Sequence, residues 1–322
     1  GRWHEHRETT KRPAVTEFFL VGLSQYPELQ LFLFLLCLIM YMIILLGNSF
    51  LIIITILDSR LHTPMYFFLG NLSFLGICYT SSSIPPMLII FVSERKSISF
   101  IGCALQMVVS LGLGSTECVL LAVMAYDRYV AICNPLLYMV VVSRRLCLLL
   151  VSLTYLYGFS TAIVVSPCIF SVSYCSSNII NHFYCDIAPL LALSCSDTYL
   201  PETVVFISAA TNLVFSMITV LVSYFNIVLS ILKICSSEGR KKAFSTCASH
   251  MMAVTIFYGT LLFMYVQPRS NHSLDTDDKM ASVFYTLVIP MLNPLIYSLR
   301  NKDVKTALQR FMTNLCYSFK TM

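Results

Sequence analysis

The chain has 322 residues, of which 57% are hydrophobic and 11% are charged, and its formal net charge is +5. A soluble globular domain carries roughly 25% charged residues, so this composition excludes such a domain and favours a membrane protein. An intramembrane enzyme is not expected either, because the sequence has neither a Gly-x-Ser-x-Gly motif nor two Asp residues within its apolar segments.

Residues 1–28 are polar, and we expect them to form an extracellular N-terminus. They lack the short apolar core followed by small residues that marks a cleavable signal peptide, and they contain no Asn that could accept a glycan. The first apolar segment is therefore expected to direct insertion into the membrane.

Seven apolar windows follow. A helix needs about 20 apolar residues to cross a hydrocarbon core about 30 Å thick, and an alternating pattern would be needed for barrel strands. The windows are continuously apolar, with Glu117 as the one charge in the third. We predict an all-α membrane protein, a seven-transmembrane helix bundle over residues 29–299. The windows are 29–57, 63–93, 100–126, 146–173, 203–232, 243–267 and 280–299.

Most of the 21 Lys and Arg residues fall on the first, third and fifth connections and on the tail after the last window. Basic residues favour the cytoplasmic side, so we expect a multi-pass protein of the plasma membrane with its N-terminus outside. We interpret the positive charge as topology and contact with membrane lipid, not as nucleic-acid binding.

The fourth connection, which we expect to be extracellular, is long and contains Cys175, Cys185 and Cys195, and Cys103 starts the third window. This side of the membrane is oxidising. Four cysteines allow three disulfide connectivities, and the residues alone leave all three open. A zinc site at Cys175, His182 and Cys185 is an alternative, which the lack of closely spaced ligand pairs disfavours.

Basic residues 240–242 precede the sixth window, and a solvated charge run is the simplest interpretation. The tail, residues 300–322, is predicted to contain a short amphipathic eighth helix on the membrane surface, because its apolar residues recur at near-helical spacing: Val304, Leu308, Phe311 and Leu315. Cys316 near its end is either an acylation site or a free thiol.

Prolines interrupt two windows. Pro85 and Pro86 lie in the second, and Pro290 and Pro294 lie in the seventh. Each removes a backbone donor and weakens the helix locally, so these positions are either hinges or static packing features.

The strongest motif is Met-Ala-Tyr-Asp-Arg-Tyr-Val-Ala-Ile-Cys at 124–133. Asp127 can form an ion pair that holds Arg128 until a partner competes for it, whereas a lone Asp-Arg would indicate only a charge at the membrane boundary. Further motifs follow in order: Gly-Asn at 47–48, Leu-His-Thr-Pro-Met-Tyr-Phe-Phe-Leu at 61–69, Ser-Tyr at 223–224, Lys-Ala-Phe-Ser-Thr-Cys-Ala-Ser-His at 242–250, and Pro-Met-Leu-Asn-Pro-Leu-Ile-Tyr-Ser-Leu-Arg-Asn at 290–301. Over residues 15–315, the chain resembles the olfactory receptor family of rhodopsin-like G-protein-coupled receptors.

The resemblance implies a small volatile odorant as ligand and a stimulatory, olfactory-type heterotrimeric G protein as partner, with cyclic AMP raised on activation. It implies disulfides between Cys103 and Cys185 and between Cys175 and Cys195. It also implies that the residues of the coupling switch are Asp127, Arg128, Tyr129, Tyr224, Lys242, Asn293, Pro294 and Tyr297.

A ligand pocket is expected between the helices near the outer face. On the third helix, the phase relative to Cys103 and Arg128 indicates Ser110, Leu111, Gly114 and Ser115, with glycines at 112 and 114 leaving room for a small ligand. For each, helix packing is the alternative. The resemblance adds Ser208, Asn212, Tyr258, Leu261, Leu262, Tyr265 and Thr286, among which Tyr258 transmits the effect of the ligand.

Two departures from the family pattern bear on function. Glu117 resembles a sodium-site carboxylate, but Gly76 stands where its usual Asp partner would be, so Glu117 is alternatively protonated or hydrogen-bonded to a neighbour such as Asn293. No other cofactor is expected. Leu137 replaces a usual Arg, which makes a non-signalling or weakly coupled receptor the main alternative. A transporter would need several intramembrane charges, and Glu117 is the only one.

Overall fold

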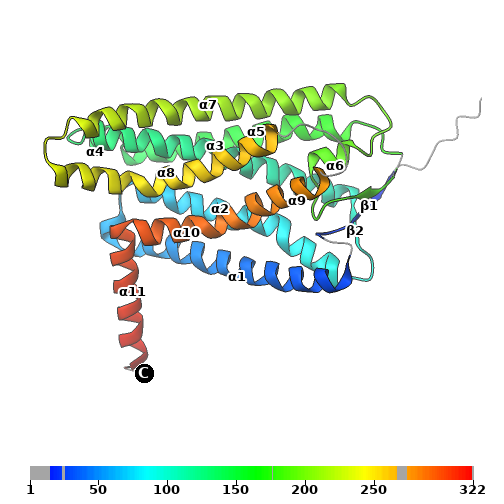
Figure 1. The fold of residues 1–322 in the computed structure, drawn as a ribbon, viewed down its shortest axis with the longest axis horizontal. Helices are drawn as coiled ribbons and strands as arrows, with labels where there is room; N and C mark the ends of the chain where they lie inside the picture. The colour runs from blue at the N-terminus through cyan, green and yellow to red at the C-terminus, as the bar shows by residue number, and fades with distance from the viewer. Residues whose placement is uncertain (1–14, 24–25, 176, 267–273, 321–322) are drawn as a thin grey trace, which may run out of the picture.

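In the computed structural model, residues 15–23, 26–175, 177–266 and 274–320 are described, except for the side chains of 265–266 and 274–278. This part of the chain contains seven helical spans long and apolar enough to cross a membrane, which confirms the predicted bundle (Figure 1). Six of these helices are α1 (Pro27–Leu57), α2 (Pro64–Val92), α3 (Phe100–Cys133), α5 (Arg144–Phe170), α7 (Tyr199–Leu232) and α8 (Ser237–Val266). The seventh span combines α9 (Leu274–Val283), the π-helical η2 (Phe284–Val288) and α10 (Ile289–Arg300).

The two ends of the bundle differ. A small sheet of β1 (Glu17–Leu20), β2 (Ser97–Ser99) and β3 (Ile179–Ile180) lies at one end, here called the sheet end. The helix α11 (Lys302–Lys320) lies across the bundle direction at the other, here called the tail end (Figure 1). Short connecting elements are η1 (Ser59–Leu61), α4 (Tyr138–Val141) and α6 (Ile187–Leu191).

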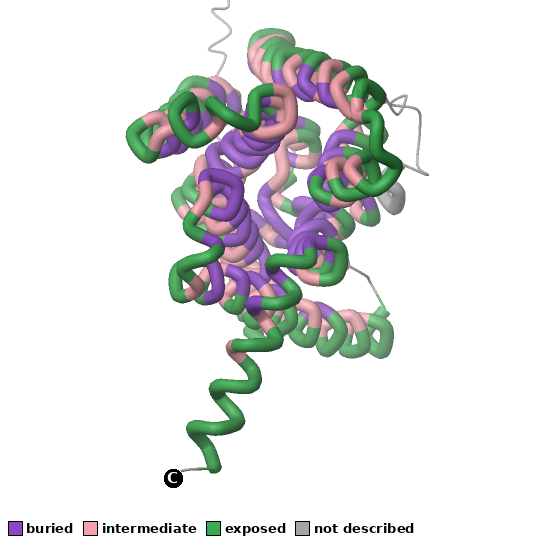
Figure 2. The backbone as a smooth tube through the Cα atoms, turned by 90° about the vertical axis from the view of Figure 1, so that its left-hand side faces the viewer, coloured by how far each residue is buried: buried purple, intermediate pink, exposed green. Residues whose placement is uncertain are grey.

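Burial shows which helices face lipid. In Figure 2 the buried segments face the middle of the bundle and the exposed ones its outside. The most apolar window of α1 is 11% buried and that of α7 is 17% buried, whereas that of α3 is 56% buried. Because the outward faces of α1 and α7 are apolar, they suit lipid as the surrounding solvent, and α3 forms the centre of the bundle.

Pro86 is accommodated without breaking α2. A proline cannot donate to the carbonyl four residues earlier, here that of Ser82. The side-chain amide of Gln106 on α3 donates to this oxygen at 3.0 Å. A residue that the sequence analysis did not single out thus satisfies the acceptor that Pro86 leaves free.

In the seventh span, two further carbonyls left free by prolines also accept hydrogen bonds from side chains of other helices. Pro290 frees the carbonyl of Thr286, which accepts a hydrogen bond of 3.3 Å from the hydroxyl of Thr80. Pro294 frees the carbonyl of Pro290, which accepts one of 3.1 Å from the side-chain amide of Asn48. The wider π-helical turn of η2, which the apolar pattern did not predict, precedes the first of these prolines.

The N-terminal strand β1 covers the sheet end. It lies between β2, with which it pairs antiparallel, and β3, with which it pairs in parallel. The side chain of Phe18 is fully buried and meets the ring of Tyr174 edge-on at 5.6 Å. Gly22 has φ +82°, a conformation that favours glycine, and its N–H donates to the carbonyl of His182 at 3.2 Å.

The predicted amphipathic eighth helix is confirmed as α11. Val304 and Ala307 are buried at its start, and the ring of Phe311 lies 6.2 Å from that of Phe50 on α1. Arg310 lies 3.5 Å from Asp58. Because the ion pair and the rings fix its first half to α1, α11 takes the course expected for a helix on a membrane surface.

Candidate functional site

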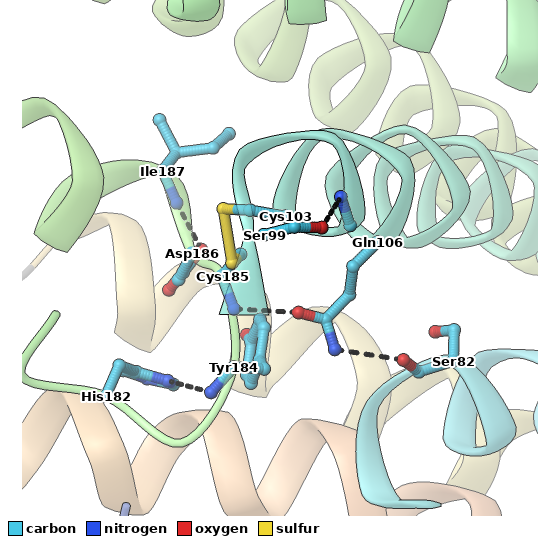
Figure 3. The surroundings of a disulfide bond; sticks show 10 residues. Ser82, Ser99, Cys103, Gln106, His182, Tyr184, Cys185, Asp186 and Ile187 are labelled. Atoms are coloured by element: carbon cyan, nitrogen blue, oxygen red, sulfur yellow. Dashed lines mark hydrogen bonds between the residues drawn. A yellow bond between two sulfur atoms is a disulfide. The ribbon is translucent and has the colours of Figure 1, made fainter. Parts of the chain in front are cut away.

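Two disulfides hold the connection between α5 and α7 at the sheet end, and Figure 3 shows the one between Cys103 and Cys185. Cys103 is bonded to Cys185, with Cα atoms 5.5 Å apart, and Cys175 to Cys195, with Cα atoms 5.9 Å apart. These are the pairs implied by the resemblance. The zinc alternative is wrong, because both cysteines it needs are disulfide-bonded, and in the described part of the chain no three potential metal ligands cluster.

Gln106 joins the segment between α5 and α7 to the helices α2 and α3. Its side-chain oxygen accepts the N–H of Cys185 at 3.0 Å, while its nitrogen donates to Ser82 (Figure 3). One buried amide therefore joins α2, α3 and the residues around the first disulfide. The signal that could have revealed it is Pro86, which leaves an acceptor that α3 must satisfy.

His182 is buried beneath the sheet. Its ring stacks on Phe183 with centroids 4.6 Å apart, and its Nε2 lies 3.2 Å from the hydroxyl of Ser282. Burial and the nearby charge of Lys279 lower the pKa of His182 to about 3. The imidazole is therefore neutral at physiological pH.

The predicted ligand residues of α3 occupy different surroundings. The hydroxyl of Ser110 lies 3.5 Å from that of Ser82. The space beside Gly112 is filled by the ring of Phe159, because a Cβ at Gly112 would lie 2.7 Å from it; the prediction that this glycine leaves room for a ligand is wrong. A Cβ on Gly114 would lie 3.3 Å from the hydroxyl of Tyr285, so this glycine faces the seventh span.

Three of the buried polar atoms without partners in the described residues lie on α7 and η2. Asn212 Oδ1, Ser216 Oγ and Thr286 Oγ1 have no hydrogen bond with any described residue. Such atoms need a partner, such as water or a ligand. Asn212 and Thr286 were predicted. Ser216 was missed, although its spacing of four from Asn212 and eight from Ser208 places all three on one face of a helix.

The other predicted pocket residues differ in exposure. Leu111, Ser115, Ser208 and Leu261 are half-buried, whereas Leu262 is 37% exposed. The side chain of Tyr265 lies outside the described residues.

Tyr258 links α8 to α3 in the middle of the bundle. Its hydroxyl donates to the carbonyl of Cys118 at 2.8 Å, and its ring meets that of Phe257 at 5.3 Å. Tyr258 therefore joins α8 to the buried middle of α3. A movement of α8 relative to α3 would have to break or remake this hydrogen bond.

Glu117 is buried on α3 beside Cys118, and the hydrogen bond between Glu117 and Asn293 stays a prediction. A Cβ on Gly76 would meet nothing closer than 3.6 Å, at Asn48 Oδ1 and Pro290 Cβ. Position 76 therefore has room for the Cβ of the Asp that the family pattern usually carries there.

Arg128 is held at the tail end of α3. Its Nη2 donates to Asp127 Oδ2 at 2.9 Å, which is the predicted ion pair, and to the hydroxyl of Tyr138 at 3.3 Å. Tyr138 in turn donates to Asp127 Oδ1 at 2.8 Å. Arg128 is only 6% exposed, and its Nε has no partner among the described residues. Tyr138, which the sequence analysis missed, thus clamps both members of the pair.

A second contact closes the tail end. The hydroxyl of Tyr224 on α7 is hydrogen-bonded to Nδ1 of His250 on α8, and His250 Nε2 lies 3.2 Å from the carbonyl of Leu121 on α3. The hydroxyl of Tyr297 is buried without a partner among the described residues. Met65, Met124, Asp127, Arg128 and His250 line a narrow gap at this end of the bundle.

The remaining predicted switch residues lie around this cluster. Asn293 and Pro294 are buried, and a Cβ on Gly47 would lie 3.2 Å from Pro294. Tyr129 is half-buried, and Lys242 is exposed near the start of α8. The structure therefore brings the predicted residues of the tail end together, with Lys242 at the margin.

Comparison with known proteins fits this geometry. Residues 36–315 match the family described as "Olfactory receptor". The chain is 77% identical over 308 residues to human "Olfactory receptor 8J1" and 73% identical over 308 residues to human "Olfactory receptor 8J3", and each alignment covers 96% of this chain and 98% of the relative. It is 57% identical over 293 residues to mouse "Olfactory receptor 8U3", which covers 91% of this chain and 92% of the relative.

Proposed function

Because the chain belongs to the olfactory receptor family, a family of receptors and not of enzymes, we propose that it is an odorant receptor. It binds a small volatile organic molecule between its helices. It then activates a stimulatory, olfactory-type heterotrimeric G protein, which raises cyclic AMP.

In this proposal the sheet end, with the N-terminus, is extracellular and the tail end is cytoplasmic in the plasma membrane. Both disulfides lie at the sheet end, and disulfides persist on the oxidising side of a membrane. The basic residues 240–242 and the basic residues of α11 lie at the tail end, as the positive-inside rule requires.

The observation that carries the proposed ligand site is the set of buried polar atoms without partners on Asn212, Ser216 and Thr286. Burying an unsatisfied polar group costs about 1–3 kcal/mol, and a ligand hydroxyl or carbonyl would remove part of that cost. The apolar neighbours Leu111 and Leu261 would select by shape. This combination of many apolar contacts and few polar ones suits a small volatile molecule.

Activation is a shift between two conformations. In the conformation seen here, Asp127 and Tyr138 hold Arg128, and the contact of Tyr224 with His250 keeps α7 and α8 together. A ligand has an effect only if it binds the other conformation more tightly. Movement of the tail end of α8 would free Arg128 and Tyr224 for the G protein.

The test is a cyclic AMP assay in cells against a panel of odorants, with surface expression measured in parallel. Arg128→Ala is expected to abolish the response while surface expression persists. Asn212→Ala is expected to weaken or change odorant selectivity, and Leu148→Ala, on the lipid-facing side of α5, serves as the control. A fully responsive Arg128→Ala receptor would remove this residue from the mechanism.

A non-signalling or weakly coupled receptor is the second candidate. Two observations favour it: Gly76 leaves Glu117 without an acidic partner, and Leu137, beside the Tyr138 clamp, is 55% exposed where the family usually carries Arg. In the same assay, a receptor that reaches the cell surface and answers no odorant at all would favour this candidate.

A further inference from the structure

A groove at the sheet end, between α1 and α2, is not used by the proposed function. About 490 Å³ of space lies along it, and this space is open to the surroundings of the protein. Its walls include Phe34 of α1 and Phe91 of α2, whose rings stack at 4.9 Å, together with Met87 and Leu88 of α2. The groove therefore offers an apolar surface where two lipid-facing helices end.

The groove is separate from the proposed odorant site. Phe183 lines it on the inner side and is only 1% exposed. Phe183 packs in one buried cluster with Tyr184 and with Leu287 of the seventh span, and none of the residues proposed for the odorant site lines the groove. The N-terminal segment Leu20–Leu23 lines the groove as well.

One cation stands at the groove. Lys96 lines it, with its ammonium 5.9 Å from the centroid of Phe91. The backbone is held in place, because the carbonyl of Lys96 accepts the N–H of Leu20 on β1 at 3.1 Å. The ammonium of Lys96 thus lies over an aromatic ring at an apolar surface. There its electrostatic attraction for a negative head group is stronger than in bulk water.

The neighbouring charges leave Lys96 available. Arg95 lies 3.7 Å from Glu17 and is used by that ion pair. Glu94 is exposed, and within the described residues no acidic side chain pairs with Lys96. A ligand carboxylate would therefore be the first anion to pair with this ammonium.

We propose that the groove binds a single-chain amphiphile with a carboxylate head group, of the fatty-acid class. Its chain lies against Phe34, Phe91 and Leu88, and its carboxylate accepts hydrogen bonds from the ammonium of Lys96. Each buried methylene contributes about 0.8 kcal/mol, so burial of the chain supplies most of the affinity. The ion pair with Lys96 selects a carboxylate head group. The site is distinct from the odorant site proposed above.

The test uses the full chain in lipid nanodiscs and a medium-chain fatty acid that carries a photoreactive diazirine, with labelled peptides mapped by mass spectrometry. Labels are expected on the ends of α1 and α2 that meet the sheet. Lys96→Ala is expected to reduce labelling by about 3-fold, the scale of one exposed ion pair. Leu88→Trp, which fills the groove, is expected to reduce it further.

Matched controls separate the site from the surrounding membrane. Lys302→Ala removes an exposed cation at the tail end, and Leu148→Trp adds the same bulk on the lipid face of α5; both should label like the wild type. A primary alcohol of the same chain and diazirine position should show no dependence on Lys96. Size-exclusion profiles and thermal unfolding establish that each variant is folded.

The proposal is overturned if the labelled peptides lie elsewhere, or if folded Lys96→Ala and Leu88→Trp variants label as strongly as the wild type. The readout is covalent labelling and not cyclic AMP. A receptor that does not signal can therefore still be labelled at the groove, and a receptor that signals can still remain unlabelled there.

Discussion

The side-chain amide of Asn48 donates a 3.1 Å hydrogen bond to the carbonyl oxygen of Pro290, the acceptor that Pro294 leaves without a backbone donor. The same amide donates to Ile44 in its own helix at 2.9 Å. One buried side chain on α1 thus supplies the hydrogen-bond donor that a carbonyl on the seventh span lacks. In lipid no water replaces such a donor, so the contact also fixes how the two helices pack.

Replacing Asn48 should therefore destabilise the bundle. Asn48→Ala leaves the Pro290 carbonyl buried without a donor, which is expected to cost about 1–3 kcal/mol. The measurement is the thermal unfolding midpoint of purified receptor in detergent. The control is Asn71→Ala, because Asn71 donates only to Phe67 within its own helix. Equal midpoints for the two variants would show that the contact with Pro290 does not stabilise the receptor.

Gln106 is expected to hold the connection between α5 and α7 against the helices. Gln106→Leu keeps the volume but removes both the donor to Ser82 and the acceptor for the Cys185 N–H. Hydrogen exchange around Cys185 should become faster, and the thermal midpoint should fall. The variant Gln106→Glu keeps the acceptor alone, so exchange near Cys185 should stay slow while the midpoint still falls. Unchanged exchange in Gln106→Leu would contradict the assignment.

Tyr138 should restrain basal signalling. Tyr138→Phe removes the hydrogen bond to Asp127, and a hydrogen bond to a charged group contributes about 1.5–3 kcal/mol when buried. Because Tyr138 is partly exposed, we expect a smaller effect, a rise in ligand-free cyclic AMP of roughly 2- to 10-fold at equal surface expression. Tyr199→Phe at the exposed start of α7 is the control. Basal cyclic AMP at or below the wild-type value would refute the clamp.

His182 should make the sheet end sensitive to acid. Its pKa is lowered from 6.5 to about 3 in the folded chain, so between these values the unfolded chain binds a proton that the folded chain does not. Stability is therefore full above pH 6.5 and falls as the pH drops toward 3, by about 1–2 kcal/mol at pH 5. His182→Gln stays neutral and should lose less stability between pH 7 and pH 5. Identical pH profiles of the thermal midpoint would exclude His182 as the cause.

Gly76 should decide whether the receptor responds to sodium. Replacing sodium with choline is expected to leave the thermal midpoint of the wild type unchanged, because Glu117 lacks an acidic partner. Gly76→Asp has space for its Cβ and supplies a second carboxylate, so it should be stabilised by sodium but not by choline. Gly76→Asn has the same shape without the charge and should show no difference. A sodium effect in the wild type would mean that Glu117 binds the ion without help.

Apolar length was sufficient to predict the fold, because lipid imposes a minimum span on each helix and satisfies no backbone group. The ends of the helices were less predictable. The third window was drawn to residue 126, whereas α3 continues to Cys133, since Asp127 and Arg128 neutralise each other within the helix. The π-helical turn at Phe284–Val288 has no signature in an apolar run.

The residues of the candidate site could be predicted only where they belong to a recognisable motif or follow from the family resemblance. The disulfide pairs and the Asp127–Arg128 pair followed from the resemblance and the motif. Tyr138, Gln106 and Ser216 were missed, because their roles depend on which helix faces which. Gly112 was misjudged for the same reason: a missing side chain indicates close approach, but only the fold shows that Phe159 and not a ligand fills the space.

The middle strand of the small sheet is the first part of the described chain to be synthesised, yet both of its neighbours come later. Its antiparallel neighbour lies beyond α2, and its parallel neighbour lies beyond α5. The strand at Glu17–Leu20 therefore has no hydrogen-bond partner until two helices have been synthesised, and its second partner follows only after four. Closure of the sheet is thus a late step in biogenesis, and it reports that the first half of the bundle has assembled.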